Sequence, residues 1–258
     1  MAGHSKWANI KHRKGRQDEK KQKIFSKFIR ELTVASRLGG PIATDNPRLR
    51  LALDKALGAN MPKDTIDRAI ARGAGNSEAD NLEEIKYEGY GPNGVAILID
   101  AMTDNRNRTV AEVRHAFTKA GGSLGTDGSV AYQFESKGII SISGLSEDDT
   151  LELVIDYDIE EIESQSEIVT VICKPDNFLN IKEILEQSNA GIENAEITML
   201  PSNSVELGDE DSEKVIRLID TLEDLDDVQN VYTNAELSEA SVTSVSYTHL
   251  TLPTRSYV

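Results

Sequence analysis

The chain has 258 residues, of which 38% are hydrophobic, with one cysteine and a formal net charge of −16. It contains no run near the roughly 18 apolar residues that a membrane-spanning helix needs, and its start lacks the apolar segment of a secretory signal. A single cysteine excludes a disulfide framework and fits a reducing compartment. These totals favour a globular protein of one to three domains that has no membrane partner.

Charge is distributed unevenly along the chain. Residues 1–75 hold 17 Lys and Arg against 7 Asp and Glu, a net charge of +10, whereas the remaining residues carry −26. A cationic segment joined to anionic ones is typical of proteins that contact nucleic acid.

The positive charge is densest in "HSKWANIKHRKGRQDEKKQKIFSKFIRE", residues 4–31. Lys and Arg bind phosphates because each contact releases condensed counterions, and a tryptophan can stack on an unpaired base. The alternatives are a solvated arm and a tryptophan that packs on the helices. We predict that the nucleic-acid contact is formed by Lys6, Trp7, Lys11, His12, Arg13, Lys14, Arg16, Lys20, Lys21, Lys23 and Lys27.

Three helices are predicted in this basic part. Apolar residues recur between Ile24 and Leu38 with the spacing of one helical face, and "GGP" ends that helix. A second helix begins at Pro47, where a missing N–H costs nothing, and ends near Gly58. The third follows "ANMP" and ends at Gly73. We therefore expect a small three-helix domain over residues 1–76.

After a polar linker, strand-like runs alternate with helical runs. Thr109 and Glu112 have the spacing of a capping box, which predicts that a helix begins at Thr109. The expected strands are 84–90, 95–101, 130–134, 138–143, 167–173, 195–200 and 228–233, and the expected helices are 109–122, 146–157, 177–187 and 212–225. This order predicts an α+β multidomain protein in which the helical domain precedes two small α/β sandwich units of the ferredoxin-like kind, each near 65 residues.

A second, weaker nucleic-acid contact is predicted in "TDNRNRT". Arg106 and Arg108 precede the expected helix start, where anions are favoured. The glycine-rich stretches "GPNG" and "AGGSLGTDGSV" lack phosphate-loop spacing and are better explained as a tight turn and a helix cap.

The sequence shows no catalytic arrangement and no metal or cofactor site, so we expect no enzyme activity and no cofactor. Cys173 is expected to be a small buried residue. The acidic runs "EDD" and "DED" fit helix starts, and "LEDLDDV" is interpreted as a solvated face.

The last residues have a different composition. Residues 240–258 contain no acid and end in "SVSYTHLTLPTRSYV". We interpret residues 239–258 as a disordered tail, either a cloning or reading-frame scar or an ordinary disordered terminus.

Three segments resemble the YebC family of probable transcriptional regulatory proteins: "MAGHSKWANIKHRKGRQDEKKQKIFSKFIREL", "NPRLRLALDKALGANMPKDTIDRAIARG" and "YEGYGPNGVAILIDAMTDNRNRTVAEVRHAFTKAGGSLGTDGSVAYQF". The resemblance covers roughly residues 1–237. It implies three domains, with the third inserted in the second. The expected domains are 1–76, then 77–136 together with 205–238, and the insert 137–204.

The resemblance implies two alternative functions. Some family members are described as DNA-binding regulators of transcription, and others, such as the mitochondrial translational activator of cytochrome oxidase subunit I, act at the ribosome. We therefore expect a nucleic-acid-binding regulator of gene expression, a DNA-binding transcriptional regulator, or alternatively a ribosome-associated translation factor that binds rRNA or tRNA. Because the chain begins at the family motif, we expect a cytoplasmic protein, and the sequence favours a monomer.

Overall fold

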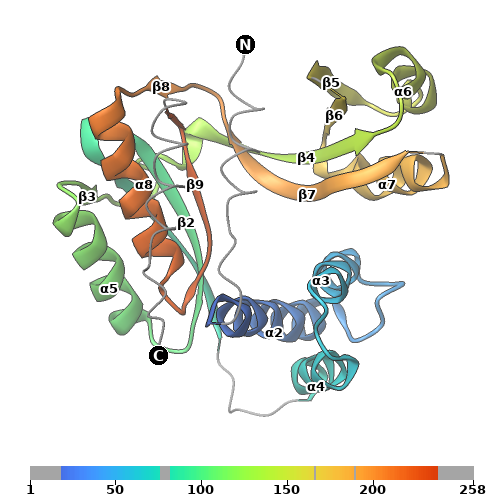
Figure 1. Cartoon of the computed structure of the whole chain (residues 1–258). Helices are drawn as coiled ribbons and strands as arrows, with labels where there is room; N and C mark the ends of the chain where they lie inside the picture. The colour runs from blue at the N-terminus through green and yellow to red at the C-terminus, as the bar shows by residue number, and fades with distance from the viewer. Residues whose placement is uncertain (1–18, 76–81, 166, 189, 238–258) are drawn as a thin grey trace, which may run out of the picture. The chain divides into compact units, whose positions relative to one another are not determined.

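The computed structural model describes residues 19–75, 82–165, 167–188 and 190–237, with only the backbone for residues 19–22 (Figure 1). The architecture is α+β: three N-terminal helices precede a β-rich region with two four-stranded antiparallel sheets. The chain divides into two compact units. Residues 131–205 form one unit, and the described residues on both sides of this segment form the other. Within the described ranges, every helix is too short or too polar to span a membrane.

The predicted three-helix domain is confirmed by α2 (Glu19–Gly39), α3 (Pro47–Gly58) and α4 (Lys63–Ala74). Its core contains Leu32, Leu49 and Ile66, each at most 1% exposed. The predicted glycine stop of α2 is also confirmed, since Gly40 adopts a φ of +87°.

The Asn46 side chain connects the end of α2 to the start of α3. Its Oδ1 accepts a hydrogen bond from the Leu49 amide at 3.0 Å, which caps α3. Its Nδ2 donates to the carbonyl oxygens of Ala35 and Gly40, both at 2.8 Å. One buried amide therefore fixes the angle between two helices.

Helices α2 and α4 cross closely because small side chains line their contact. Hydroxyl groups of α2 donate to carbonyl oxygens of α4, from Thr33 to Ala69 at 3.2 Å and from Ser36 to Ile70 at 2.8 Å. A Cβ atom added at Gly73 would lie 2.2 Å from the Thr33 carbonyl oxygen. The crossing therefore requires glycine at this position.

The first sheet has the strand order β3-β1-β2-β9. Its strands are β1 (Glu83–Tyr90), β2 (Ala96–Thr103), β3 (Ser123–Leu124) and β9 (Val228–Thr233). The predicted turn between β1 and β2 is confirmed, with positive φ angles at Asn93 and Gly94. Two helices, α5 (Arg106–Lys119) and α8 (Asp209–Glu223), lie side by side on one face of this sheet (Figure 1).

The second sheet has the strand order β5-β6-β4-β7. Its strands are β4 (Phe134–Ser143), β5 (Ile159–Gln165), β6 (Ile168–Cys173) and β7 (Gly191–Pro201). Helix α6 (Glu147–Val154) contacts β5, and α7 (Phe178–Gln187) contacts β4 and β7. Two short strands, β8 (Val205–Glu206) and β10 (Ala235–Glu236), form a separate pair.

Cys173 is buried, as predicted, and burial raises the pKa of its thiol to about 11. The thiol is therefore protonated at neutral pH, which suits a packing role.

One strand prediction is wrong, and one long strand was not predicted. Residues 130–134 were expected to form a separate strand, but Ala131–Gln133 form a 3-10 turn and Phe134 begins β4. The reason is a buried carboxylate of β1: Glu88 accepts a hydrogen bond from the Val130 amide at 2.7 Å, which bends the chain there. Strand β5 was not predicted, because its glutamates separate its two isoleucines and leave no alternating apolar pattern in the sequence. In the structure it pairs with β6 along most of its length.

The predicted capping box at Thr109 is also wrong. Helix α5 begins at Arg106, and Asn105 caps it by accepting the Arg108 amide at 3.1 Å. Thr109 is fully buried inside the helix, and its hydroxyl group donates to the Asp227 carboxylate at 2.7 Å. The Thr109 hydroxyl group therefore binds Asp227, which is distant in sequence, and does not form the local capping box with Glu112 that the spacing indicated.

We predict that Gly73→Ala destabilises the protein by about 1–3 kcal/mol, because the added methyl group collides with the α2 backbone. Helix propensity alone would favour alanine by about 1 kcal/mol, so the sign of the effect separates the two explanations. The measurement is urea unfolding followed by far-UV circular dichroism. The control is Gly58→Ala, which has open space around its Cβ and should be neutral or stabilising.

Candidate nucleic-acid interface

Part of the predicted interface lies outside the described residues. This holds for Lys6, Trp7, Lys11, His12, Arg13, Lys14 and Arg16, and for the side chains of Lys20 and Lys21. The geometry below therefore concerns the other four predicted residues, namely Lys23, Lys27, Arg106 and Arg108.

The ammonium groups of Lys23 and Lys27 lie at the C-terminal end of α8. Lys23 Nζ donates to the Asp224 carbonyl oxygen at 3.0 Å and lies 3.5 Å from its carboxylate. Lys27 Nζ donates to the Glu223 carbonyl oxygen at 3.1 Å. The last carbonyl groups of a helix carry partial negative charge and attract cations. Both lysines therefore have protein partners where the sequence predicted phosphates.

Arg30 continues the same face of α2, seven residues after Lys23. Its guanidinium group donates to the Met102 carbonyl oxygen at 3.1 Å and to that of Asp226, and it lies 3.0 Å from an Asp227 carboxylate oxygen. We call Lys23, Lys27 and Arg30 the α2 clamp, because all three attach the helical domain to the segment around residues 223–227.

Asp227 is the buried centre of these contacts. Its side chain is 2% exposed, and its carboxylate accepts hydrogen bonds from the hydroxyl groups of Thr103 and Thr109 at 3.0 and 2.7 Å. The Arg108 guanidinium group donates to it at 2.7 Å. Burial disfavours ionisation, but the hydrogen bonds from Arg108 and the threonines outweigh it and hold the pKa of Asp227 below its ordinary value.

The interpretation of "LEDLDDV" as a solvated face is therefore wrong at its sixth residue. Asp227 directly precedes the buried start of β9. That position in the sequence could have indicated burial, because a residue next to a buried strand often lies in the interior as well. The three neighbouring acids hid this signal.

Arg108 is also committed to internal partners. Its guanidinium group forms ion pairs with Asp104 at 2.9 Å and Asp227 at 2.7 Å. The hydrogen bond to Asp227, followed by the one to Asp104, raises the pKa of Arg108 above its ordinary value. Arg108 therefore positions the start of α5 against β9.

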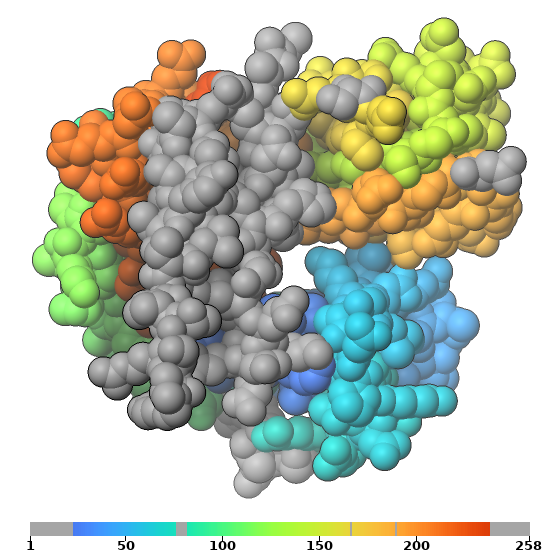
Figure 2. All heavy atoms as spheres, in the orientation of Figure 1, coloured from blue at the N-terminus to red at the C-terminus, as the bar shows by residue number. Residues whose placement is uncertain are grey.

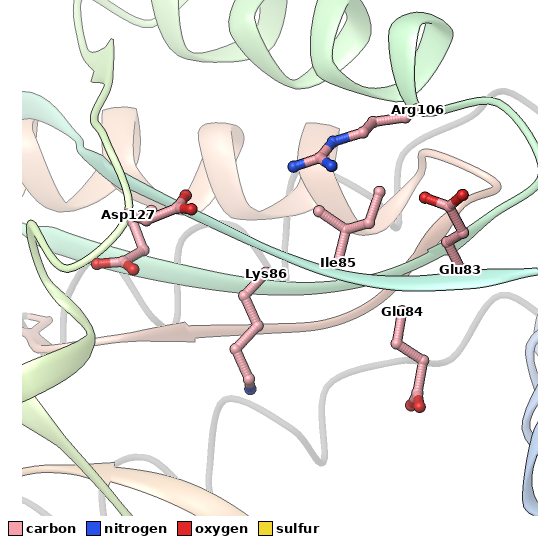
Figure 3. A pocket seen from close by; sticks show the side chains of 7 residues that line it. Glu83, Glu84, Ile85, Lys86, Arg106 and Asp127 are labelled. Atoms are coloured by element: carbon pink, nitrogen blue, oxygen red, sulfur yellow. The ribbon is translucent and has the colours of Figure 1, made fainter. Parts of the chain in front are cut away.

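Arg106 has a different environment. It is exposed, and it overhangs a hollow along β1 whose other lining residues are Glu83, Glu84, Ile85, Lys86, Glu88 and Asp127. Figure 3 shows Arg106, Glu83 and Ile85 on one side of β1, with Glu84 and Lys86 on the other. Glu84 is paired with Arg48, and Lys86 is paired with Asp100. Arg106 has no ion pair among the described residues, whereas Arg108 has two. The two arginines that the sequence grouped together therefore have different environments.

The glycine-rich segment beside this hollow has a structural role, as predicted. Gly121 has a φ of +78° just after the end of α5. The Gly128 amide donates to the Glu88 carboxylate at 2.7 Å, and the Gly125 amide donates to the Glu88 carbonyl oxygen at 2.7 Å. These amides are occupied by the protein itself. In the parts of the chain that the structure describes, no group of three or more His, Cys, Asp or Glu residues could hold a metal ion.

Comparison with known proteins identifies the class to which this fold belongs. Residues 5–76 match the family model of the TACO1/YebC protein N-terminal domain, and residues 82–235 match that of the TACO1/YebC second and third domain. The chain therefore belongs to the TACO1/YebC family.

Individual relatives agree with this assignment. The chain is 59% identical over 241 residues to a "Probable transcriptional regulatory protein" of Pseudomonas putida, and the match covers 93% of this chain and 97% of that protein. It is 57% identical, with the same coverage, to the "Transcriptional regulatory protein PmpR" of Pseudomonas aeruginosa. The crystal structure of the conserved hypothetical protein Aq1575 from Aquifex aeolicus is similar, with a TM-score of 0.78 and 47% identity over 88% of this chain and 94% of that one.

We predict that Asp227→Asn lowers the free energy of unfolding by about 3 kcal/mol at pH 7, because it removes the charge that two arginines share. The folded-state pKa of Asp227 lies below the unfolded value of about 3.9, so its contribution is complete above that pH and is lost as the pH falls through the folded-state pKa. The difference between parent and variant should thus be constant from about pH 5 to 8 and shrink below about pH 4.

Urea unfolding at several pH values measures this difference. The control is Asp224→Asn, which removes a carboxylate whose side chain is 68% exposed and should change stability by less than about 1 kcal/mol. Equal effects of the two variants would contradict the central role of Asp227.

Proposed function

We propose that this protein is a nucleic-acid-binding regulator of gene expression that acts as a DNA-binding regulator of transcription. The observation that carries the proposal is the separation of charge, with +10 in residues 1–75 and −26 in the remainder. An acidic protein is repelled by nucleic acid unless its cations are gathered in one place. The names of the Pseudomonas relatives, which are transcriptional regulatory proteins, support the same interpretation.

The contact is made mainly to phosphates. In the helical domain, the exposed side of α4 mixes Lys63 and Arg72 with Asp64 and Asp67, and acids next to a phosphate backbone oppose close approach. Arg68 donates to the Asp64 carbonyl oxygen of its own helix at 3.0 Å. A helix of this kind is poorly suited to read base edges in the major groove. We therefore expect affinity with little dependence on base sequence.

The outer residues of the α2 clamp lie at the margin of this interface. The Lys23 and Asp224 side chains are 45% and 68% exposed, and ion pairs that are this exposed contribute little to stability. Phosphates can therefore compete for Lys23 at small cost. Arg30, which contacts the buried Asp227, stays in place and keeps the helical domain attached.

A second candidate is a ribosome-associated translation factor that binds rRNA or tRNA. The observation that favours it is Trp7 between His4 and His12 in a Lys- and Arg-rich segment. Aromatic side chains beside cations suit irregular, partly single-stranded RNA better than regular duplex DNA.

We also infer the fold of the second sheet, the domain boundaries and the cellular location. The second sheet follows the chain order β4-α6-β5-β6-α7-β7 with the strand order β5-β6-β4-β7, which corresponds to the ferredoxin-like arrangement. We take residues 137–204 as a domain inserted between residues 77–136 and 205–238, in a protein that works in the cytoplasm as a monomer.

We predict that replacing Lys11, Arg13, Lys14 and Arg16 together by glutamine weakens nucleic-acid binding and flattens its salt dependence. Four lost phosphate contacts should reduce the slope of log affinity against log salt by about 3.6 on duplex DNA. The measurement is fluorescence anisotropy of a labelled duplex between about 50 and 200 mM salt. An unchanged slope would remove the arm from the mechanism.

The matched control replaces Lys174, Lys182, Lys214 and Arg217, which changes the net charge equally at cations that are already paired with acids. Retention of the parent protein on a promoter fragment would support the transcriptional role. Co-sedimentation with ribosomes, without such retention, would favour the translational role instead.

A further inference from the structure

The acidic part of the chain pairs most of its few cations. Residues 82–237 contain ten Lys and Arg and 34 Asp and Glu. Seven of the ten cations form ion pairs with carboxylates in the structure, namely Lys86, Arg108, Lys137, Lys174, Lys182, Lys214 and Arg217. With more than three acids for each cation, such pairing is the expected arrangement.

The three cations in this range that form no ion pair with a described residue all lie on α5. They are Arg106, Arg114 and Lys119, and each is exposed. Helix α5 carries four Lys and Arg against one acid, Glu112, a net charge of +3. Its neighbour α8 has a net charge of −4, and both of its cations are paired within the same helix. Figure 2 shows α5 and α8 at the surface, in green and orange.

The face that α5 turns to solvent suits contact with a polymer backbone. Thr109, Val113, Ala116 and Phe117 form its buried side. At 100° per residue, the opposite side has a central strip of small side chains, Asn107, Ala111 and Thr118. Arg114 borders this strip on one side, and His115 and Lys119 border it on the other. Small residues between cations allow a phosphate backbone to approach the helix closely.

Interactions within the protein explain only part of the positive charge of α5. Lys119 lies in the last turn, where the helix dipole favours a cation. Arg114 lies in the middle of the helix, and Arg106 lies in the first turn, where a cation is disfavoured. Neither arginine gains an acidic partner among residues 82–165, 167–188 or 190–237. Both side chains are exposed to solvent, so an external anion has access to them.

We propose that the exposed face of α5 is a second contact surface for the phosphodiester backbone of nucleic acid, formed by Arg114 and Lys119, whereas Arg106 lies on the side of α5 that faces β1. This surface rests on the proposed function and is distinct from the N-terminal arm. The helix is about 20 Å long, which spans about six phosphates of one strand of duplex DNA. With an acidic helix beside it, the surface orients the bound strand along α5 and away from α8.

The test compares two variants of the full chain that have the same net charge. One replaces Arg114 and Lys119 by glutamine, and the other replaces Lys174 and Lys182, two paired cations of the other compact unit, by glutamine. Binding to a DNA duplex and to a single-stranded RNA, each of about 20 nucleotides per strand, is measured between about 50 and 200 mM salt. The α5 variant should lose about 1.8 from the salt slope on duplex DNA, or about 1.4 on single-stranded RNA. The control should change affinity less than about twofold, as expected for a charge change away from the interface.

The outcomes separate the two proposals. If the parent binds nucleic acid and the α5 variant behaves like the control, the α5 surface is wrong and the proposed function stands. If the parent binds neither DNA nor RNA, both are wrong. A loss confined to one of the two probes identifies which nucleic acid α5 contacts. Should the double variant lose its fold by circular dichroism, each single variant, Arg114→Gln or Lys119→Gln, should still lose about half of the slope change, and no loss in either would overturn the proposal.

Discussion

The structure depends on one buried carboxylate. Asp227 receives hydrogen bonds from β2 and α5 through Thr103, Thr109 and Arg108, and it lies 3.0 Å from Arg30 of the helical domain. A buried charge is tolerated only when such partners surround it. The same group therefore holds α5 against the sheet and attaches the helical domain to it.

A second attachment lies nearer the surface and shows why position decides the strength of an ion pair. Arg48 forms ion pairs with Glu31 of α2 at 2.7 Å and with Glu84 of β1. The hydrogen bond from Arg48 lowers the pKa of Glu84. Because these side chains are partly exposed, each pair contributes less than the buried contacts of Asp227. The helical domain is thus fixed by one strong contact and several weaker ones.

The cations of this protein fall into two groups, according to whether they form an ion pair with a carboxylate of the protein. Most cations of the acidic part balance neighbouring carboxylates, whereas Arg106, Arg114 and Lys119 remain without an ion pair on α5 among the described residues. In the basic part, Lys23 and Lys27 contact the end of α8, although the sequence placed them among the phosphate contacts. Cation density in a sequence therefore does not show which cations are paired within the protein and which face solvent.

The sequence by itself determined the elements whose signals are local. The apolar stripe of α2, the proline at the start of α3, the turn at Asn93 and Gly94 and the α+β class all follow from patterns within a few residues. Only the tertiary structure decided the burial of Asp227, the internal pairing of Arg108 and the start of α5 at Arg106. These depend on groups that meet from distant parts of the chain, such as Arg30 and Asp227. A local pattern records how a residue suits its own helix or strand, whereas the environment of a charge is set by whichever segments pack around it.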